Sequence, residues 1–577
     1  MTAAADDATA EPTTWIASHF RIRLLTATAL VLLATIPYLP TLRGPFFWDD
    51  AQNIEFNRSL RTSAGLIPIW TDPLASFQYY PLTYSLFWIE FGFFGERPFG
   101  FHVVSLALHA INALLVWRTL AALRAPASWW VAALFAVHPI QVETVGWISE
   151  QKNLLSTAFT LLALRLWEAS REAKTVVATN RAFGVATIAL IAALMAKTVA
   201  LVLPFWIAVY EFVLGRRPIG RWLPRLSIWI VLGLAAGLVT SWRETATSTP
   251  TSSADTPPVL RFDERILLSC QSLWRYVGMS CCLEPFVPIP SRSAPSWNNP
   301  AAIASFAGVL VALWFAVAQC RRGRPWNLLG LALFAFFLGP TLGLVRFQFQ
   351  CHSFVADHFA YLACTGLFLA LIAAARIPTT TSTRVVGAVV LAMLTIATWN
   401  QSRLFAVPER LWRANIEANP LSWGARVNLA DAFLKAGFTN AALDAATQAV
   451  VLEPSAAVGY GIVGTASAQL GMLRDAERAF RDALRLSPGD PRFHHNLANV
   501  LVRQARVREA IEEYRVAAER APDFAMTHYL IGDAYRKLEM IPEAKAAMSR
   551  ALEIDPEFES ARRALESLES PPKNQLK

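Results

Sequence analysis

Residues 300–318 read PAAIASFAGVLVALWFAVA, an apolar run without a charged side chain. As a helix this run is about 28 Å long, which is enough to cross roughly 30 Å of hydrocarbon. Similar runs recur along the first 401 residues, and the 577-residue chain is 54% hydrophobic and 16% charged, with a mean hydropathy of +0.36. These values exclude a soluble globular enzyme and a disordered chain, and they predict a membrane protein with many spans.

The net charge of +9 lies in this hydrophobic part, because residues 402–577 hold 23 basic and 23 acidic side chains. The surplus is concentrated in short connectors between apolar runs, such as those with Arg118 and Arg124 or with Arg321 and Arg322. Such connectors are typical of cytoplasmic loops. The charge therefore indicates membrane orientation, and we expect no nucleic-acid partner.

Eleven spans follow if these connectors are cytoplasmic. The predicted spans are residues 22–41, 101–121, 128–146, 153–168, 183–199, 200–214, 226–242, 300–318, 328–344, 358–375 and 385–401. With an odd number of spans, residues 1–21 form a cytoplasmic tail, and residues 42–100, 243–299, 345–357 and everything after 401 lie outside. The first apolar run has span length and no small-residue cleavage site after it, so we expect an uncleaved anchor. Residues 266–283 are predicted to lie in the interface or to re-enter, with a further span as the alternative.

A 34-residue period begins after residue 401. Proline recurs at Pro420, Pro454, Pro488, Pro522 and Pro556, and small residues recur at Ala442, Ala476, Ala510 and Ala544. Small side chains allow two antiparallel helices to approach closely, and proline ends the second helix of each pair. The pattern resembles the tetratricopeptide repeat (TPR) family. The resemblance implies an α-solenoid in residues 402–577, with repeats at 420–453, 454–487, 488–521 and 522–555 and a capping helix near 558–568.

Glycine holds the turn position in the first two repeats, as Gly437 and Gly471. In the later repeats Ala505 and Glu539 stand where glycine is usual. We expect these two turns to be less ideal than the first two.

Two adjacent carboxylates follow the first span, in the stretch Gly44-Pro-Phe-Phe-Trp-Asp49-Asp50. Like charges this close to hydrocarbon are costly. One interpretation is an interfacial acidic turn that caps a short helix. The other is a general base with a neighbouring ligand for a cation or substrate, because a carboxylate can accept a proton from an attacking hydroxyl.

Several further phrases accompany this pair. They are Tyr80-Pro-Leu-Thr83, Gly100-Phe-His102, Leu108-His109-Ala-Ile-Asn112, His138-Pro-Ile-Gln-Val-Glu143 and Trp147-Ile-Ser-Glu-Gln-Lys152. In combination they resemble the transmembrane and tetratricopeptide-repeat protein O-mannosyltransferase family, from about residue 46 to 361 and on through the repeats. The resemblance implies an all-α membrane bundle of the GT-C glycosyltransferase type that uses a polyprenyl-phosphate-linked sugar.

The resemblance also assigns roles to residues. Asp49 and Asp50 match the catalytic acidic pair; Asp49 is favoured as the base with Asp50 in support, although the order can be reversed. His138, Glu143 and Lys152 match positions that contribute to substrate binding. Lys197 matches a family lysine, with Thr198 in place of the usual following acid. A lysine between two apolar runs is costly unless it pairs with an anion such as the lipid phosphate, or merely extends to the outer headgroups.

The last outer connector contains Asp357-His358-Phe-Ala-Tyr361-Leu. It resembles the family's acid-Arg-x-x-Tyr-Leu-Pro phrase, with His358 where arginine is common and Ala363 in place of proline. Phosphate binding from this loop is then weaker or dependent on pH, and Arg346 is expected to supply charge instead. The alternative interpretation of Asp357 and His358 is a cap on the following span.

The expected function is inverting transfer of mannose or another hexose to a hydroxyl of a protein acceptor, which the TPR groove holds. The alternatives are a non-catalytic membrane-anchored scaffold for envelope proteins, and a transferase that acts on a glycan or lipid. No cofactor is certain, and a divalent cation stays open. The composition favours a bacterial inner membrane with the repeats on the periplasmic side, and the endoplasmic reticulum is the alternative.

Overall fold

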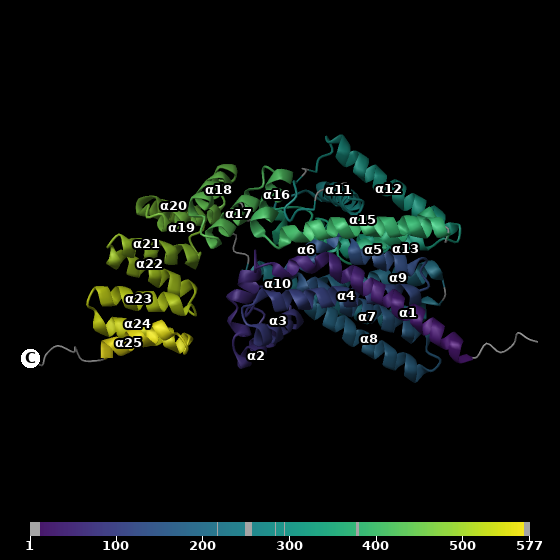
Figure 1. The fold of residues 1–577 in the computed structure, drawn as a ribbon, viewed down its shortest axis with the longest axis horizontal. Coiled ribbons are helices and arrows are strands. Elements are labelled where there is room, and N and C mark those ends of the chain that lie inside the picture. Colours follow the sequence, from purple (N-terminus) through teal and green to yellow (C-terminus); the bar gives the residue numbers. More distant parts are fainter. Residues whose placement is uncertain are drawn as a thin grey trace, which may run out of the picture. The chain divides into compact units, whose positions relative to one another are not determined.

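The computed structural model describes residues 12–215, 217–247, 257–282, 284, 286–292, 295–376 and 380–569. These residues form helices, with no β-strand among them (Figure 1). The chain divides into a membrane unit, residues 1–247 and 259–414, and a repeat unit, residues 415–577 together with the segment 248–258. The predicted all-α class, a membrane helical bundle followed by a TPR solenoid, is confirmed.

The membrane unit contains the first fifteen α-helices. They are α1 (Pro12–Thr35), α2 (Leu66–Thr71), α3 (Pro81–Phe94), α4 (Pro98–Ala122), α5 (Ser128–Val137), α6 (Val142–Gly146), α7 (Gln151–Glu172), α8 (Val176–Ala196), α9 (Leu203–Leu214), α10 (Ile219–Thr247), α11 (Phe262–Ser280), α12 (Pro300–Arg321), α13 (Trp326–Leu338), α14 (Ala363–Ala375) and α15 (Thr381–Phe405). Within the residues that the structure describes, six helical segments are long and apolar enough to cross a membrane, and four apolar segments are shorter. The number of spans therefore remains a prediction.

The structure divides the predicted span 128–146 and has a second helix break near the predicted boundary between the spans 183–199 and 200–214. The stretch 128–146 breaks at His138, whose backbone is extended because the following proline disfavours the helical conformation. Near residue 197, α8 ends and a short 3-10 helix, η7 (Thr198–Val202), leads into α9. The segment from His138 to Glu150, in which α6 is flanked by short 3-10 turns, is buried in protein.

The repeat unit consists of helix pairs. The helices are α17 (Trp423–Lys435), α18 (Thr439–Leu452), α19 (Ala457–Gln469), α20 (Leu473–Leu486), α21 (Pro491–Arg503), α22 (Val507–Arg520), α23 (Ala525–Lys537), α24 (Ile541–Ile554) and α25 (Glu559–Glu569). The periodic alanines pack between paired helices and are buried. α16 (Pro408–Ala418) precedes the repeats and contains the boundary between the units, some residues later than the sequence-based boundary at 402.

The periodic prolines have a partner that sequence analysis missed. In four of the five cases the carbonyl oxygen of the proline accepts a hydrogen bond from the side chain six residues later: Arg426 (2.6 Å), His494 (3.1 Å), His528 (3.0 Å) and Arg562. Because proline ends a helix and leaves carbonyls without helical partners, this contact closes the turn at these four positions. The two histidines therefore have structural contacts in the solenoid.

All four turns within the helix pairs are left-handed. Gly437 and Gly471 have φ of 80°, and Ala505 and Glu539 have φ of 63° and 61°. A side chain in this region is strained, whereas glycine is not. The expectation that the later turns are less ideal is confirmed.

Candidate functional site

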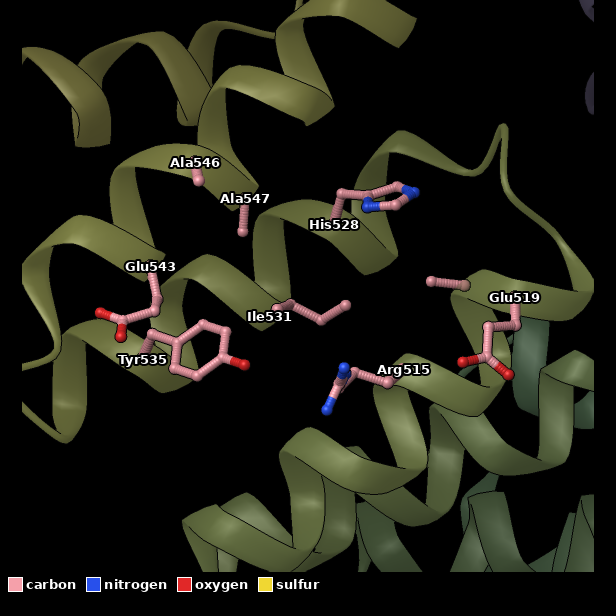
Figure 2. Close-up of a pocket in the computed structure, with 9 residues that line it drawn as sticks. Arg515, Glu519, His528, Ile531, Tyr535, Glu543, Ala546 and Ala547 are labelled. Carbon is pink, nitrogen blue, oxygen red and sulfur yellow. The ribbon is translucent and has the colours of Figure 1, made fainter.

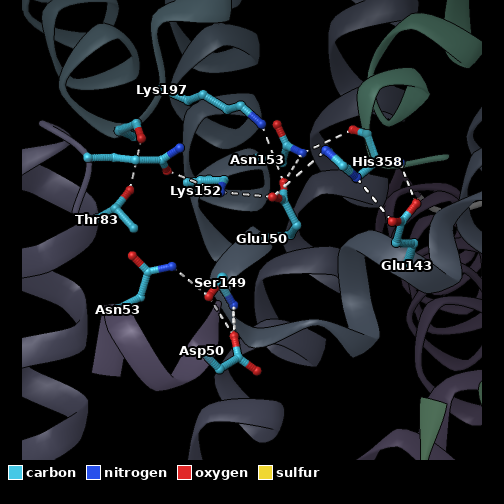
Figure 3. A network of polar contacts seen from close by, with 12 residues as sticks. Asp50, Asn53, Thr83, Glu143, Ser149, Glu150, Lys152, Asn153, Lys197 and His358 are labelled. Atoms are coloured by element: carbon cyan, nitrogen blue, oxygen red, sulfur yellow. Dashed lines mark hydrogen bonds and ion pairs between the residues drawn. The ribbon is translucent and has the colours of Figure 1, made fainter. Parts of the chain in front are cut away.

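The acidic pair lies in a segment that we call the acid loop (residues 46–50), and its two members have different surroundings. Asp50 is completely buried. Its Oδ1 accepts hydrogen bonds from the backbone N (2.8 Å) and Oγ (2.5 Å) of Ser149, and its Oδ2 accepts one from the Phe47 backbone (3.2 Å) (Figure 3). Asn53 also donates to Ser149 Oγ (2.9 Å). Asp50 therefore anchors the acid loop to the segment before α7.

Asp49 is only half-buried, and among the described residues its Oδ1 has no hydrogen-bond partner. Burial raises the pKa of Asp49, while attraction to Lys152 opposes the increase, so this ammonium group is within electrostatic reach. Burial and the charge of Asp49 raise the pKa of Asp50 to about 8. Ionisation of Asp49 therefore disfavours ionisation of Asp50.

The central side chain of the site is Glu150, which the sequence prediction did not include. Its Oε1 lies 2.9 Å from Lys152 Nζ and its Oε2 lies 3.3 Å from Lys197 Nζ (Figure 3). The His358 ring lies 4.0 Å away and Asn153 donates a hydrogen bond to Oε2. Burial alone would raise the pKa of Glu150, but His358 and the two lysines lower it well below its usual range. The one signal in the sequence was an acid within the polar run 149–153 at the start of an apolar helix.

The two lysines come from different helices. Lys152 lies in the first turn of α7 and also donates to Gln78 Oε1 (3.2 Å). Lys197 directly follows α8 with extended backbone, and its carbonyl accepts a hydrogen bond from Ser156 of α7 (3.2 Å). Thr83 of α3 donates to the preceding carbonyl of Ala196 (2.9 Å). The end of α8 is thus held so that Lys197 makes an ion pair inside the protein.

Glu143 and His358 form a second pair next to Glu150. Glu143 Oε2 accepts a hydrogen bond from the His358 backbone (3.1 Å), and its Oε1 lies 3.2 Å from His358 Nδ1. Asp357 is buried, and burial together with the Glu143 charge raises its pKa well above the usual range. The side chain of Asp357 does not cap the next helix, because the N-cap of α14 is Leu362.

Two predicted site residues, His138 and Tyr361, make hydrogen bonds elsewhere, and a third, Arg346, is exposed. His138 accepts from the Ile140 backbone (3.2 Å) through Nδ1 and is 3.0 Å from the Ser280 carbonyl through Nε2. The Tyr361 hydroxyl forms a hydrogen bond with His109 Nδ1 (2.8 Å) and accepts one from the side-chain amide of Asn112 (3.2 Å). Arg346 is exposed on the segment after α13. The structure therefore brings together Asp49, Asp50, Glu143, Lys152, Lys197, Asp357 and His358 around Glu150, and gives His138 and Tyr361 packing contacts.

A metal ligand set is absent from the part of the chain that the structure describes, where no group of three histidine, cysteine or acidic side chains is close enough to hold an ion. The repeat unit has a separate feature, an open pocket of about 410 Å³ between α22, α23 and α24 (Figure 2). Polar side chains at its edge include Arg515, Glu519, Tyr535 and Glu543, and Ile531 forms part of its apolar floor.

Family models agree with the repeat architecture. Three tetratricopeptide repeat family models match residues 427–491, 468–534 and 527–558. Among solved structures, that of MamA is 24% identical and covers 26% of this chain and 83% of its own, with a TM-score of 0.24. The structure of YrrB, a TPR protein, is 18% identical and covers 31% of this chain and 91% of its own, with a TM-score of 0.26. The fold and the family models define a polytopic membrane protein with a TPR solenoid.

The names of similar curated proteins are more specific than the repeat models, because they include an activity. Human protein O-mannosyl-transferase TMTC3 is 22% identical over 92% of this chain and 64% of its own length. Protein O-mannosyl-transferase F38B6.6 of Caenorhabditis elegans is 32% identical over 157 residues, 25% of this chain and 23% of its own. The chain therefore spans less than two thirds of the curated relatives it matches. Over most of its length it is thus similar to proteins named protein O-mannosyl-transferase, in agreement with the resemblance of its motifs.

Proposed function

We propose that this protein is a GT-C glycosyltransferase that moves mannose or another hexose from a polyprenyl-phosphate-linked donor to a hydroxyl of a protein acceptor. The observation that carries the proposal is the contrast within the acid loop. Asp50 is fully hydrogen-bonded, whereas Asp49 has a carboxylate oxygen without a partner among the described residues, beside a buried pair of lysines. The names of the relatives support the reaction class.

In the proposed reaction Asp49 accepts the proton of the acceptor hydroxyl as its oxygen attacks the anomeric carbon. The new oxygen–carbon bond forms on the face opposite the phosphate, and the bond between the anomeric carbon and the phosphate oxygen breaks. The configuration at that carbon is inverted. The proton remains on Asp49 and the phosphate leaves with one more negative charge.

Lys152 and Lys197 are placed to stabilise that charge. An ammonium group has three donors. Lys152 uses two of them, on Gln78 and Glu150, and Lys197 uses one, on Glu150, so with respect to the described residues three remain for phosphate oxygens. Two ammonium groups against the single carboxylate of Glu150 leave one net positive charge. The Asp49 carboxylate balances this charge before transfer, and the departing phosphate balances it afterwards.

Burial of these charges also bears on the scaffold alternative. Ionic groups out of water carry a desolvation cost of several kcal/mol each, which an inert membrane anchor has no need to bear. We therefore favour the enzyme. The acceptor would occupy the repeat pocket, where Arg515 and Tyr535 border the same space (Figure 2). Repeat solenoids offer extended surfaces of this kind to polypeptides.

The site is proposed to face the outer side of a bacterial inner membrane, with the repeats in the periplasm. The basic connectors, such as the one with Arg321 and Arg322, support a cytoplasmic position for the opposite helix ends. The polyprenyl chain of the donor and the surrounding lipids would contact the apolar surfaces of the spans.

The test is transfer by purified full-length protein in lipid, with a polyprenyl-phosphate sugar and a serine- and threonine-containing peptide. Asp49→Asn should lower the rate by about 100-fold or more, the range of general-base catalysis. Asp72→Asn is the matched control, because Asp72 is an exposed aspartate of the same outer segment. Wild-type turnover in the Asp49→Asn protein contradicts the assignment of the base. Absence of both donor binding and transfer in the wild type favours the scaffold, and transfer to a glycan or lipid alone favours the other transferase.

A further inference from the structure

Trp48, the residue before the proposed base, has an unusual backbone. Its φ is 56°, in the left-handed region that bulky side chains rarely adopt. Such a conformation persists only where the surrounding structure holds it, and it occurs preferentially at functional sites. Because the backbone at residue 48 sets the direction in which residue 49 leaves the chain, whatever holds Trp48 also sets the position of Asp49.

Two tryptophans hold the Trp48 ring. Trp147 stacks on it with a centroid distance of 4.7 Å and an interplanar angle of 6°. Trp412 makes an edge contact at 5.2 Å and 73°, in the T-shaped geometry that aromatic pairs favour. Trp412 is 2% exposed, so its indole is buried where it contacts Trp48.

The acid loop is thereby supported from two parts of the chain. One support is the segment before α7, through the Trp147 stack and the hydrogen bonds between Asp50 and Ser149. The other is the segment from α15 to α16, where Phe405 contacts Phe47 (6.0 Å) in addition to the Trp412 contact. Trp412 lies in the part of α16 that belongs to the membrane unit, and α16 is the last helix before the repeats.

We infer that Trp412 is a positioning residue: its contact with Trp48 maintains the left-handed backbone and thereby fixes the Asp49 carboxylate for proton transfer. The inference rests on the proposed function for its catalytic consequence. The structural part, that Trp412 holds the acid loop, stands on the ring contacts alone. The helix that joins the membrane unit to the repeats then contributes to the support of the base.

The experiment compares Trp412→Ala and Trp412→Phe in the full chain, with Trp423→Ala as control because Trp423 is a buried tryptophan of the repeat unit. Amide hydrogen exchange of residues 46–50 is measured alongside transfer kinetics. Trp412→Ala should accelerate exchange in the acid loop. It should also lower kcat by about 100-fold, the scale associated with a displaced catalytic group. The KM for the lipid donor should stay within about twofold, since the proposed phosphate contacts are made by Lys152 and Lys197, which Trp412 does not support.

Trp412→Phe, which retains an aromatic edge, should restore slow exchange and most of kcat, and Trp423→Ala should leave exchange in the acid loop unchanged. In a Trp48→Gly background the left-handed backbone is unstrained, so adding Trp412→Ala should have little further effect. Unchanged exchange at residues 46–50 in Trp412→Ala, or a full effect in the Trp48→Gly background, overturns the inference. Because exchange needs no turnover, failure of the proposed function is distinguishable: it abolishes the kinetic result and leaves the exchange result intact.

Discussion

Replacing Glu150 with glutamine keeps the shape of the side chain but removes the charge that two ammonium groups share at 2.9 and 3.3 Å. The three side chains are 1%, 8% and 15% exposed for Glu150, Lys152 and Lys197, so water can compensate little of the loss. Removing one partner of a buried ion pair costs about 3–5 kcal/mol, because the remaining charge is left without compensation. We expect the free energy of unfolding of Glu150→Gln to fall by this amount, since the two lysines also lose the anion between them.

The assay is chemical unfolding of the full chain in mild detergent, with amide exchange across residues 147–153 as the local measurement. The matched control is Glu96→Gln, because Glu96 pairs with Arg61 at 2.8 Å but is 66% exposed, and exposed pairs contribute about 0–1 kcal/mol. Adding Lys197→Met to Glu150→Gln removes one uncompensated charge and should recover about 0.5–3 kcal/mol. Equal losses in Glu150→Gln and Glu96→Gln, or no recovery in the double variant, would refute the role of Glu150 as the shared counter-charge.

The pH dependence of stability should report Asp50, whose folded pKa of about 8 exceeds the ordinary value of 3.8. Between pH 3.8 and 8 the folded state therefore binds more protons than the unfolded state. The free energy of unfolding should fall with rising pH by up to about 1.4 kcal/mol per pH unit relative to Asp50→Asn. Parallel plots of unfolding free energy against pH for the two proteins, over about pH 5–8, would contradict this. In the repeats, Ala505→Gly and Glu539→Gly should each stabilise the solenoid by about 1 kcal/mol, since both residues have positive φ. Slower amide exchange in α21–α24 would confirm this, whereas Gly437→Ala should have the opposite effect in α17 and α18.

The predicted repeats and the acidic pair were accessible to sequence analysis for different reasons. A proline every 34 residues reflects helix ends within one repeat, so the pattern needs no knowledge of distant contacts. The pair at Asp49 and Asp50 was recognised because adjacent carboxylates near a span are costly. The sequence could not show that Asp50 is hydrogen-bonded while Asp49 Oδ1 has no partner among the described residues, because this difference depends on where Ser149 lies in the fold.

The span predictions show where a one-dimensional pattern is insufficient. An average over residues 128–146 is apolar, yet the helix stops at Val137 because His138 precedes a proline. The buried, irregular segment that follows carries Glu143 and Glu150 into the site. Hydropathy records only that this segment leaves water, and it does not distinguish a helix from a buried turn.

From the residues alone one obtains the membrane class, the solenoid and most members of the site, because run length, repeat period and motif are properties of neighbouring positions. Only the tertiary structure shows that Glu150 is the centre of the charge cluster and that Trp412 contacts Trp48. Lys152, Lys197 and His358 belong to separate elements, and the distances between them arise from how α7, α8 and the loop before α14 pack. A charge's partner is set by such three-dimensional packing, about which spacing along the chain carries no information.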